Sequence, residues 1–193
     1  MIKLILGVMH RDGEELNKVI NMVDSYLNEG LRNIGIELPT DYLNREYGIR
    51  TFFFGDIAEY FRKKGINIIP LENPETWDEY HSLGIVEQVM KNEISKEEIK
   101  AYIRETEITP YLPPEEVYYR WILNKRFKKA LEVLNKISSL EDLEKLAEFL
   151  INEREEKMLE KINEYKPDLI LVGDGHAQKI KQKLPEYEYK RGY

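Results

Sequence analysis

The hydrophobic pattern of the chain begins as an alternation of strands and helices. Short continuous apolar runs, typical of strands buried on both faces of a sheet, occupy residues 2–6, 33–38 and 66–71. Between these runs the apolar positions recur with helical spacing, and the two helices end at Gly30 and Gly65. The order β-α-β-α-β is typical of a parallel sheet with right-handed crossovers. The pattern therefore predicts an α/β fold with a mainly parallel sheet and flanking helices.

The periodicity changes after the third strand. Residues 76–139 are mostly helical, with a proline-rich interruption near Pro110. The pattern then predicts a long helix, a fourth strand, a short helix and an edge strand, at residues 140–165, 168–172, 176–184 and 187–190. We predict a single α/β domain over residues 1–193, with its core in residues 1–75 and 140–193. Residues 76–139 would form a helical insertion between the third and fourth core strands.

Composition narrows the classes of function. The chain of 193 residues is 42% hydrophobic and 34% charged, and its net charge is −7. That charge argues against nucleic acid and against an anionic membrane as partners, because both bind basic surfaces. The absence of cysteine excludes disulfides, thiolate catalysis and zinc–thiolate sites. No apolar run is long enough for a bilayer or a signal peptide, so we expect a cytoplasmic protein. Abundant Glu and Lys favour a thermophilic source.

Two of the three histidines lie in the same local pattern, G-x-x-H after an apolar strand. The first motif runs from Gly7 to His10, and the second runs from Gly173 to His176. The carboxyl ends of strands carry the binding sites of α/β proteins, so both motifs are expected at the functional edge of the sheet. Gly7, Gly173 and Gly175 permit sharp turns and a close approach of ligand to backbone. The glycines of the second motif are also suited to an anion at the following helix N-terminus.

Two carboxylates belong to the same predicted edge. Glu37 ends the second strand and Glu72 ends the third, so both would lie near His10 and His176. Such a group suits a divalent metal, with Mn, Co and Zn as candidates, or general acid–base chemistry without a metal. Each residue alone is better explained as a helix cap or a surface residue, and only the shared edge of the sheet favours a site. Glu37 is the most informative, because a carboxylate inside a buried strand needs a partner.

A charged residue also interrupts an apolar helix face. Arg154 lies four residues after Leu150 and four before Met158, inside the apolar stripe of the helix over residues 140–165. One interpretation makes Arg154 the partner of Glu37. The other lays its aliphatic stem on the core and extends its head into water. The remaining polar candidates are expected at the surface, namely Glu153, Glu155, Glu156 and, on an earlier helix, His81.

Taken in order, these motifs resemble the TraB/PrgY proteins, which belong with the Tiki proteases and, more distantly, with erythromycin esterase and ChaN-like proteins. The stretch over residues 152–158 is similar to the arginine-bearing helix of that family. The other residues that carry the resemblance are Gly7, His10, Glu37, Leu38, Gly173, Gly175 and His176. The resemblance implies an α/β core with a helical insertion. It also implies a catalytic site formed by His10, Glu37, Arg154 and His176.

Because the chemistry of these relatives varies over one scaffold, more than one function is expected. The leading hypothesis is a metal-dependent hydrolase that cleaves amide or ester bonds of a small-molecule or peptide substrate. His10 and His176 would bind the metal or act as bases, with Glu37 and Glu72 as further metal ligands, while Arg154 would stabilise an oxyanion. The alternative is a non-catalytic protein that binds haem, an anion or a small molecule at the same crevice. A third interpretation makes the helical insertion the contact of a homodimer.

Overall fold

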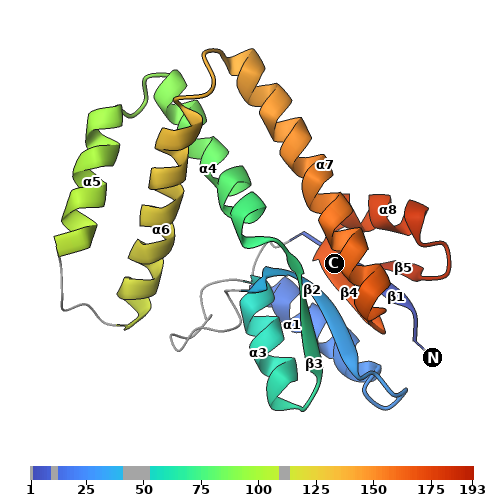
Figure 1. Cartoon of the computed structure of the whole chain (residues 1–193). Coiled ribbons are helices and arrows are strands. Elements are labelled where there is room, and N and C mark those ends of the chain that lie inside the picture. Colours follow the sequence, from blue (N-terminus) through green and yellow to red (C-terminus); the bar gives the residue numbers. More distant parts are fainter. Residues whose placement is uncertain (1, 10–12, 41–52, 109–113) are drawn as a thin grey trace. The chain divides into compact units, whose positions relative to one another are not determined.

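The chain divides into two compact units, each described here by itself. The computed structural model describes residues 2–9, 13–40, 53–108 and 114–193 (Figure 1). The first unit, here named the sheet unit, comprises residues 1–45, 49–72 and 155–193. The second, here named the helical unit, comprises residues 46–48 and 73–154. His10, the first candidate ligand of the sequence, lies outside the described residues.

A five-stranded sheet forms the centre of the sheet unit. All its neighbouring strands pair in parallel, in the order β3-β2-β4-β1-β5. The strands are β1 (Leu4–Val8), β2 (Asn33–Pro39), β3 (Asn67–Glu72), β4 (Leu169–Gly173) and β5 (Glu188–Arg191). β1 is buried along its whole length, as a strand covered on both faces must be. The predicted α/β class with a parallel sheet is confirmed, and the five strands lie within two residues of their predicted positions.

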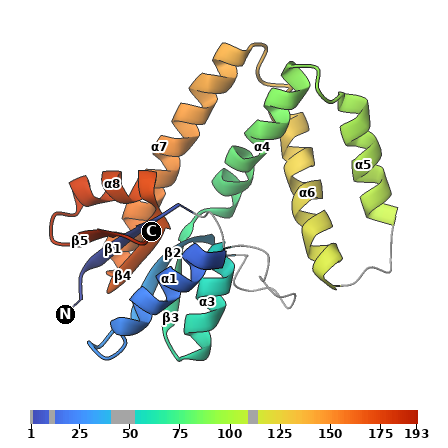
Figure 2. The ribbon, with the colours of Figure 1, turned by 180° about the vertical axis from the view of Figure 1, so that it is seen from behind.

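Helices cover both faces of this sheet (Figures 1 and 2). α1 (Gly13–Ser25) and α3 (Phe53–Lys63) lie on one face, and α8 (Asp174–Lys183) and the last turns of α7 (Leu140–Tyr165) lie on the other. The core under α7 and α8 includes Ile5, Leu71, Met158, Ile162, Val172, Ile180 and Tyr187. Each buried aliphatic side chain stabilises the fold by about 1.5–3 kcal/mol relative to exposure. The helices are therefore fixed on the sheet mainly by hydrophobic burial.

The connections of the strands diverge between β2 and β4. From β2 the chain turns through α3 to β3, at one edge of the sheet, whereas from β4 it crosses through α8 to β5 at the other edge. Two neighbouring parallel strands with diverging connections leave a crevice at their carboxyl ends, where α/β proteins bind ligands. The topology therefore selects the ends of β2 and β4, at Glu37 and Gly173, as the place to look for a site.

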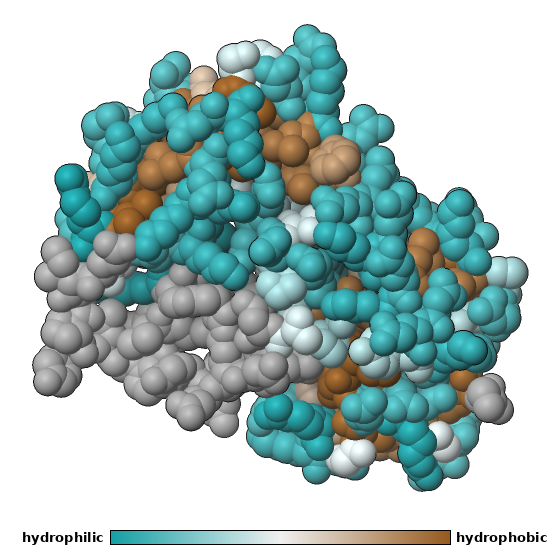
Figure 3. All heavy atoms as spheres, in the orientation of Figure 1, coloured by the Kyte–Doolittle hydropathy of each residue, from teal (hydrophilic) through white to brown (hydrophobic). Residues whose placement is uncertain are grey.

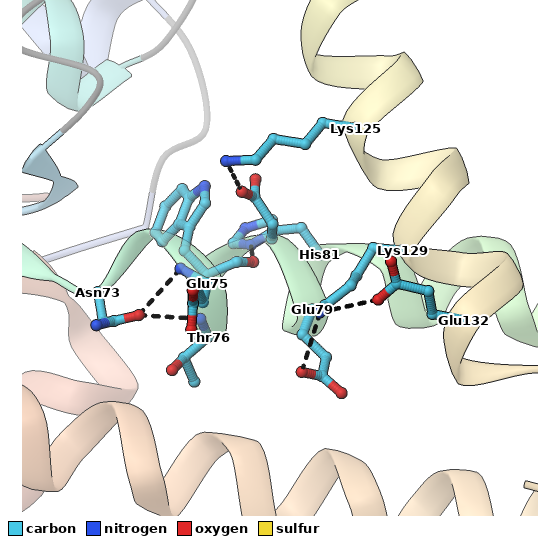
Figure 4. Close-up of polar contacts among 10 residues, drawn as sticks. Asn73, Glu75, Thr76, Glu79, His81, Lys125, Lys129 and Glu132 are labelled. Carbon is cyan, nitrogen blue, oxygen red and sulfur yellow. Dashed lines mark hydrogen bonds and ion pairs between the residues drawn. The ribbon is translucent and has the colours of Figure 1, made fainter. Parts of the chain in front are cut away.

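The helical unit contains α4 (Pro74–Met90), α5 (Lys96–Ile108), α6 (Pro114–Val133) and the first part of α7. Asn73 begins α4 as a good N-cap, because its side-chain oxygen accepts from the backbone N–H groups of Glu75 and Thr76 at 2.9 and 3.3 Å (Figure 4). The buried apolar residues of α4, α6 and α7 form a separate core with Leu83, Val86, Ala130, Val133, Leu134, Leu143 and Leu150. This unit therefore has a hydrophobic core of its own.

The surface of the molecule is largely hydrophilic on the face that Figure 3 draws. On this face apolar side chains show mainly in a band over the helical unit. Leu140 and Phe149 of α7 are among the large apolar residues that stay exposed. Within the described part of the chain, every helix is too short or too polar to span a bilayer.

Candidate functional site

Glu37 joins the ends of the two strands that flank the crevice. Its side chain is buried at the end of β2, and its Oε2 accepts a hydrogen bond of 2.6 Å from the backbone N–H of Gly173, at the end of β4. Gly173 is also the N-cap of α8 and has no side chain to cap it. A carboxylate at this position is stabilised by the positive end of the helix dipole. The charge of Glu37 is therefore supported by the backbone N–H of Gly173.

His176 lies between two carboxylates of the sheet unit. Its Nδ1 is 3.0 Å from Oε1 of Glu155, and its Nε2 is 3.8 Å from Oε1 of Glu37. An ionised carboxylate only accepts hydrogen bonds, so the hydrogen of this pair is on Nδ1 of the histidine. In the neutral ring the lone pair is then on Nε2, which is turned toward Glu37. The arrangement fixes both the orientation and the tautomer of the imidazole.

Glu155 is the functional residue that the sequence analysis missed. It was expected on the solvated flank of α7, but only 12% of its side chain is exposed, and it contacts both His176 and Lys179, the latter at 3.0 Å. A signal was present in the spacing. Glu155 lies three residues before Met158 and seven before Ile162, so it shares the helix face that packs on the sheet. A carboxylate on that face is carried toward the edge of the sheet.

The donor atoms at this edge fit a divalent metal. Nε2 of His176 and Oε1 of Glu37 are a nitrogen and an oxygen ligand, the types that Zn, Mn and Co accept. These two atoms are 3.8 Å apart, wider than the separation of about 3.3 Å that bonds of about 2 Å give in a tetrahedral site, so binding one ion would bring them closer together. A metal-binding histidine commonly donates its other N–H to a carboxylate, as His176 does to Glu155. Among the residues that the structure describes, no group of three or more His, Cys, Asp or Glu side chains is arranged so that it could hold a metal ion.

Glu72 ends β3, beside β2, and is buried. Lys161 of α7 donates hydrogen bonds to the backbone oxygens of Pro70 and Glu72, at 3.2 and 2.8 Å. Burial lowers the pKa of Lys161, and the negative charges of Glu72 and Glu164 oppose that shift without cancelling it. Glu72 is thus placed at the predicted edge, with a half-buried lysine as a neighbour.

Gly7 serves the packing of the second motif. A Cβ atom at Gly7 would lie 2.5 Å from Oδ1 of Asp174 and 3.1 Å from the ring of Tyr189. The group that approaches this backbone is therefore the first residue of α8. By contrast, a Cβ at Gly175 would meet nothing within 4 Å. The backbone N–H of Gly173 is engaged by Glu37, a carboxylate of the protein itself, at the position where the sequence predicted an anion.

Asp174 links the start of α8 to the end of the chain. Its carboxylate accepts hydrogen bonds from Tyr189, from Gln178 at 3.0 Å and from Tyr193 at 3.1 Å. Burial raises the pKa of Asp174, but these hydrogen bonds and the charge of Arg191 outweigh that effect and hold the pKa below its usual value. Asp174 therefore holds the first turn of α8, two residues before His176.

Arg154 belongs to the helical unit, whereas Glu37 belongs to the sheet unit. Only 2% of Arg154 is exposed, so it does not extend into water as one interpretation expected. Its guanidinium carbon lies 4.6 Å from the ring centre of Tyr80 and 5.3 Å from that of Trp77, both on α4. These are cation–π distances, which explain how part of its burial is compensated. The pairing of Arg154 with Glu37 stays a prediction.

A hydrogen bond fixes the chain at Met9, directly after β1 and before His10, which is not described. The backbone N–H of Met9 donates a hydrogen bond of 2.6 Å to Oε1 of Glu15, a buried carboxylate of α1. This contact keeps the strand end at the edge where Glu37 and His176 lie.

Comparison of the chain with protein-family models, with curated proteins and with solved structures finds no match. The resemblance to the TraB/PrgY proteins therefore stays a prediction from the motifs. The structure brings the trio of Glu37, His176 and Glu155 together near the carboxyl ends of β2 and β4.

Proposed function

We propose that the sheet unit is a hydrolase of amide or ester bonds that works with a divalent metal, for which Mn, Co and Zn are the candidates. One observation carries the proposal. Glu155 holds the Nδ1 side of His176, so that Nε2 faces Glu37 in the crevice where the strand connections diverge. An oriented imidazole facing a carboxylate is the arrangement that hydrolytic water activation needs.

Each member of the trio has a distinct role in this proposal. Glu155 orients His176 and stabilises positive charge on its ring, as a carboxylate behind a catalytic histidine does. The Nε2 lone pair of His176 binds the cation or accepts a proton from water. Glu37 ligates the cation through Oε1 or takes the proton of the attacking water, while Gly173 holds its other oxygen. The metal, when bound, supplies polarisation of the carbonyl and a more acidic water.

We propose further that the chain is a distant relative of the TraB/PrgY proteins. The proposal is supported by the topology, because Glu37 of β2 and His176 of α8, which follows β4, belong to neighbouring strands and the helix after one of them. In this proposal His10 adds a second histidine to the site.

The test is a screen of the purified full chain against nitrophenyl esters and fluorogenic peptides, with and without added Mn²⁺, Co²⁺ or Zn²⁺. We expect His176→Ala and Glu37→Gln each to lower hydrolysis by about a hundredfold or more, because each removes an acid–base or ligand group. Glu186→Gln is the matched control, since Glu186 is exposed and lies outside the trio.

Metal analysis of the same preparations separates the hydrolase from its rival. Stoichiometric metal that is lost in His176→Ala supports the proposal. Activity that survives both His176→Ala and Glu37→Gln would overturn it. A co-purifying chromophore without hydrolysis would favour the non-catalytic binding protein.

A further inference from the structure

A second histidine lies in a different chemical setting, in the helical unit. His81 of α4 stacks on Trp77 with ring centres 4.1 Å apart, and its Nδ1 is 2.8 Å from the backbone oxygen of Trp77. A carbonyl oxygen only accepts, so Nδ1 carries the hydrogen. Burial, and then the positive charges of Arg126 and Arg154, lower the pKa of His81 to about 3. The ring is therefore neutral at physiological pH, and its surroundings disfavour a cation.

Two guanidinium groups reach this part of α4 from two other helices. Arg154 comes from α7 and lies over the rings of Trp77 and Tyr80. Arg126 comes from α6, and its charge acts on His81. The Nε atom of Arg126 is buried and has no hydrogen-bond partner among the described residues. A buried donor without a partner is rare in folded proteins, and an ion bound at that point is one of its ordinary explanations.

The neighbouring carboxylates are matched with other cations. Asp78 forms an ion pair with Lys125. Glu79 lies 3.8 Å from Lys129, which also contacts Glu132 at 3.1 Å (Figure 4). For Arg126, in contrast, no ion pair is found with any residue whose side chain the structure describes, which leaves out residues 114–119, 121 and 122 of α6. Its buried Nε–H is thus a donor for which the described residues supply no acceptor.

We propose that Arg126 and Arg154, together with Trp77 and His81, bind a small oxyanion, either a carboxylate or a phosphate group. A guanidinium offers several N–H donors in one plane, which match the oxygens of both groups. The neutral imidazole and the indole ring close the site without adding negative charge. The site lies wholly within the helical unit and does not depend on the hydrolase of the sheet unit.

The experiment titrates the full chain with inorganic phosphate and, separately, with acetate. Nuclear magnetic resonance follows the His81 ring and the Trp77 indole, and calorimetry gives the affinity. We expect saturable shifts of both rings with at least one anion. Arg126→Gln should weaken that binding about tenfold or more, because a charge-assisted hydrogen bond is lost. Arg104→Gln removes the same charge from an exposed position of α5 and should change the affinity less than twofold.

The outcomes decide the proposal in each direction. Saturable binding that is lost in Arg126→Gln and partly kept in Arg126→Lys supports it, and the tighter anion identifies the ligand class. Equal binding by the wild type and Arg126→Gln would overturn it, as would the absence of saturable shifts with both anions. If Arg126→Gln does not fold, the wild-type titration still decides, because shifts that map away from His81 and Trp77 would contradict the site.

Discussion

His176 and His81 are the same side chain in opposite electrostatic surroundings. His176, in the sheet unit, lies between the carboxylates of Glu37 and Glu155. His81, in the helical unit, has the guanidinium groups of Arg126 and Arg154 as its charged neighbours. In both rings Nδ1 faces an oxygen acceptor, so both present Nε2 as the reactive nitrogen. The difference lies in the charged groups near each ring, which are carboxylates at His176 and guanidinium groups at His81. The proposed sites, one for a cation and one for an anion, rest on this difference.

The largest effect is expected where the carboxylate behind His176 is neutralised. Glu155→Gln keeps a hydrogen-bond acceptor for Nδ1 but removes the charge, so hydrolysis should fall about 10- to 100-fold. The pH profile of kcat should also shift, which a purely structural defect would not produce. Glu156→Gln, at an exposed position of the same helix, is the control. A variant with unchanged activity and profile would remove Glu155 from the site.

The next largest effect is a loss of stability when the packing of Gly7 against Asp174 is disturbed. Gly7→Ala places a Cβ against the carboxylate of Asp174, and overpacking of this kind costs about 1–3 kcal/mol of unfolding free energy. Gly175→Ala is the matched control, since it meets nothing within 4 Å and lies in helix α8, where alanine is favoured over glycine. Urea denaturation measures both. Equal stability of Gly7→Ala and the wild type would mean that Asp174 does not rest on Gly7.

The buried neutral ring predicts a loss of stability in mild acid. The pKa of His81 is about 3 in the folded chain against 6.5 for a free ring, so only the unfolded chain gains a proton between these values. The neutral ring's contribution to the free energy of unfolding is complete above pH 6.5 and declines as the pH falls toward 3. Between pH 7 and pH 5 it should amount to about 2 kcal/mol. The difference between the wild type and His81→Gln, from urea denaturation at both pH values, isolates it. A pH-independent difference would contradict the burial of a neutral ring.

The smallest expected effect is the change in the pKa of His81 when the charge of Arg126 is removed. Arg126→Gln removes one of the two positive charges that act on His81, so the pKa of His81 should rise toward its ordinary value. Burial, the larger cause, remains, and the rise should therefore be incomplete. A titration of the His81 ring by nuclear magnetic resonance measures it. A pKa that does not move would show that Arg126 is too far away to form part of an anion site.

Strands β1 to β4 were predictable because each is mainly apolar, and a strand buried on both faces has little choice of composition. Glu37 stood out for the same reason, as the one acid inside such a run. β5 is polar and was predicted as an edge strand. Glu155 did not stand out, because its neighbours in sequence are also acidic and only the packing of α7 on the sheet separates it from them. His81 was expected at the surface but is partly buried, and its charged neighbours Arg126 and Arg154 come from helices far along the chain. Local pattern thus revealed the edge of the sheet but not the long-range contacts that set its charge.

The most direct test of the contrast between the two histidines is a pair of titrations followed on both imidazole rings of the wild-type chain by nuclear magnetic resonance. Zn²⁺, which is diamagnetic, should shift the ring of His176 and leave that of His81 unchanged. Phosphate should shift the ring of His81 and leave that of His176 unchanged. If both ions perturb the same ring, or if Zn²⁺ binds without any change at His176, the assignment of a cation site to the sheet unit and an anion site to the helical unit is wrong.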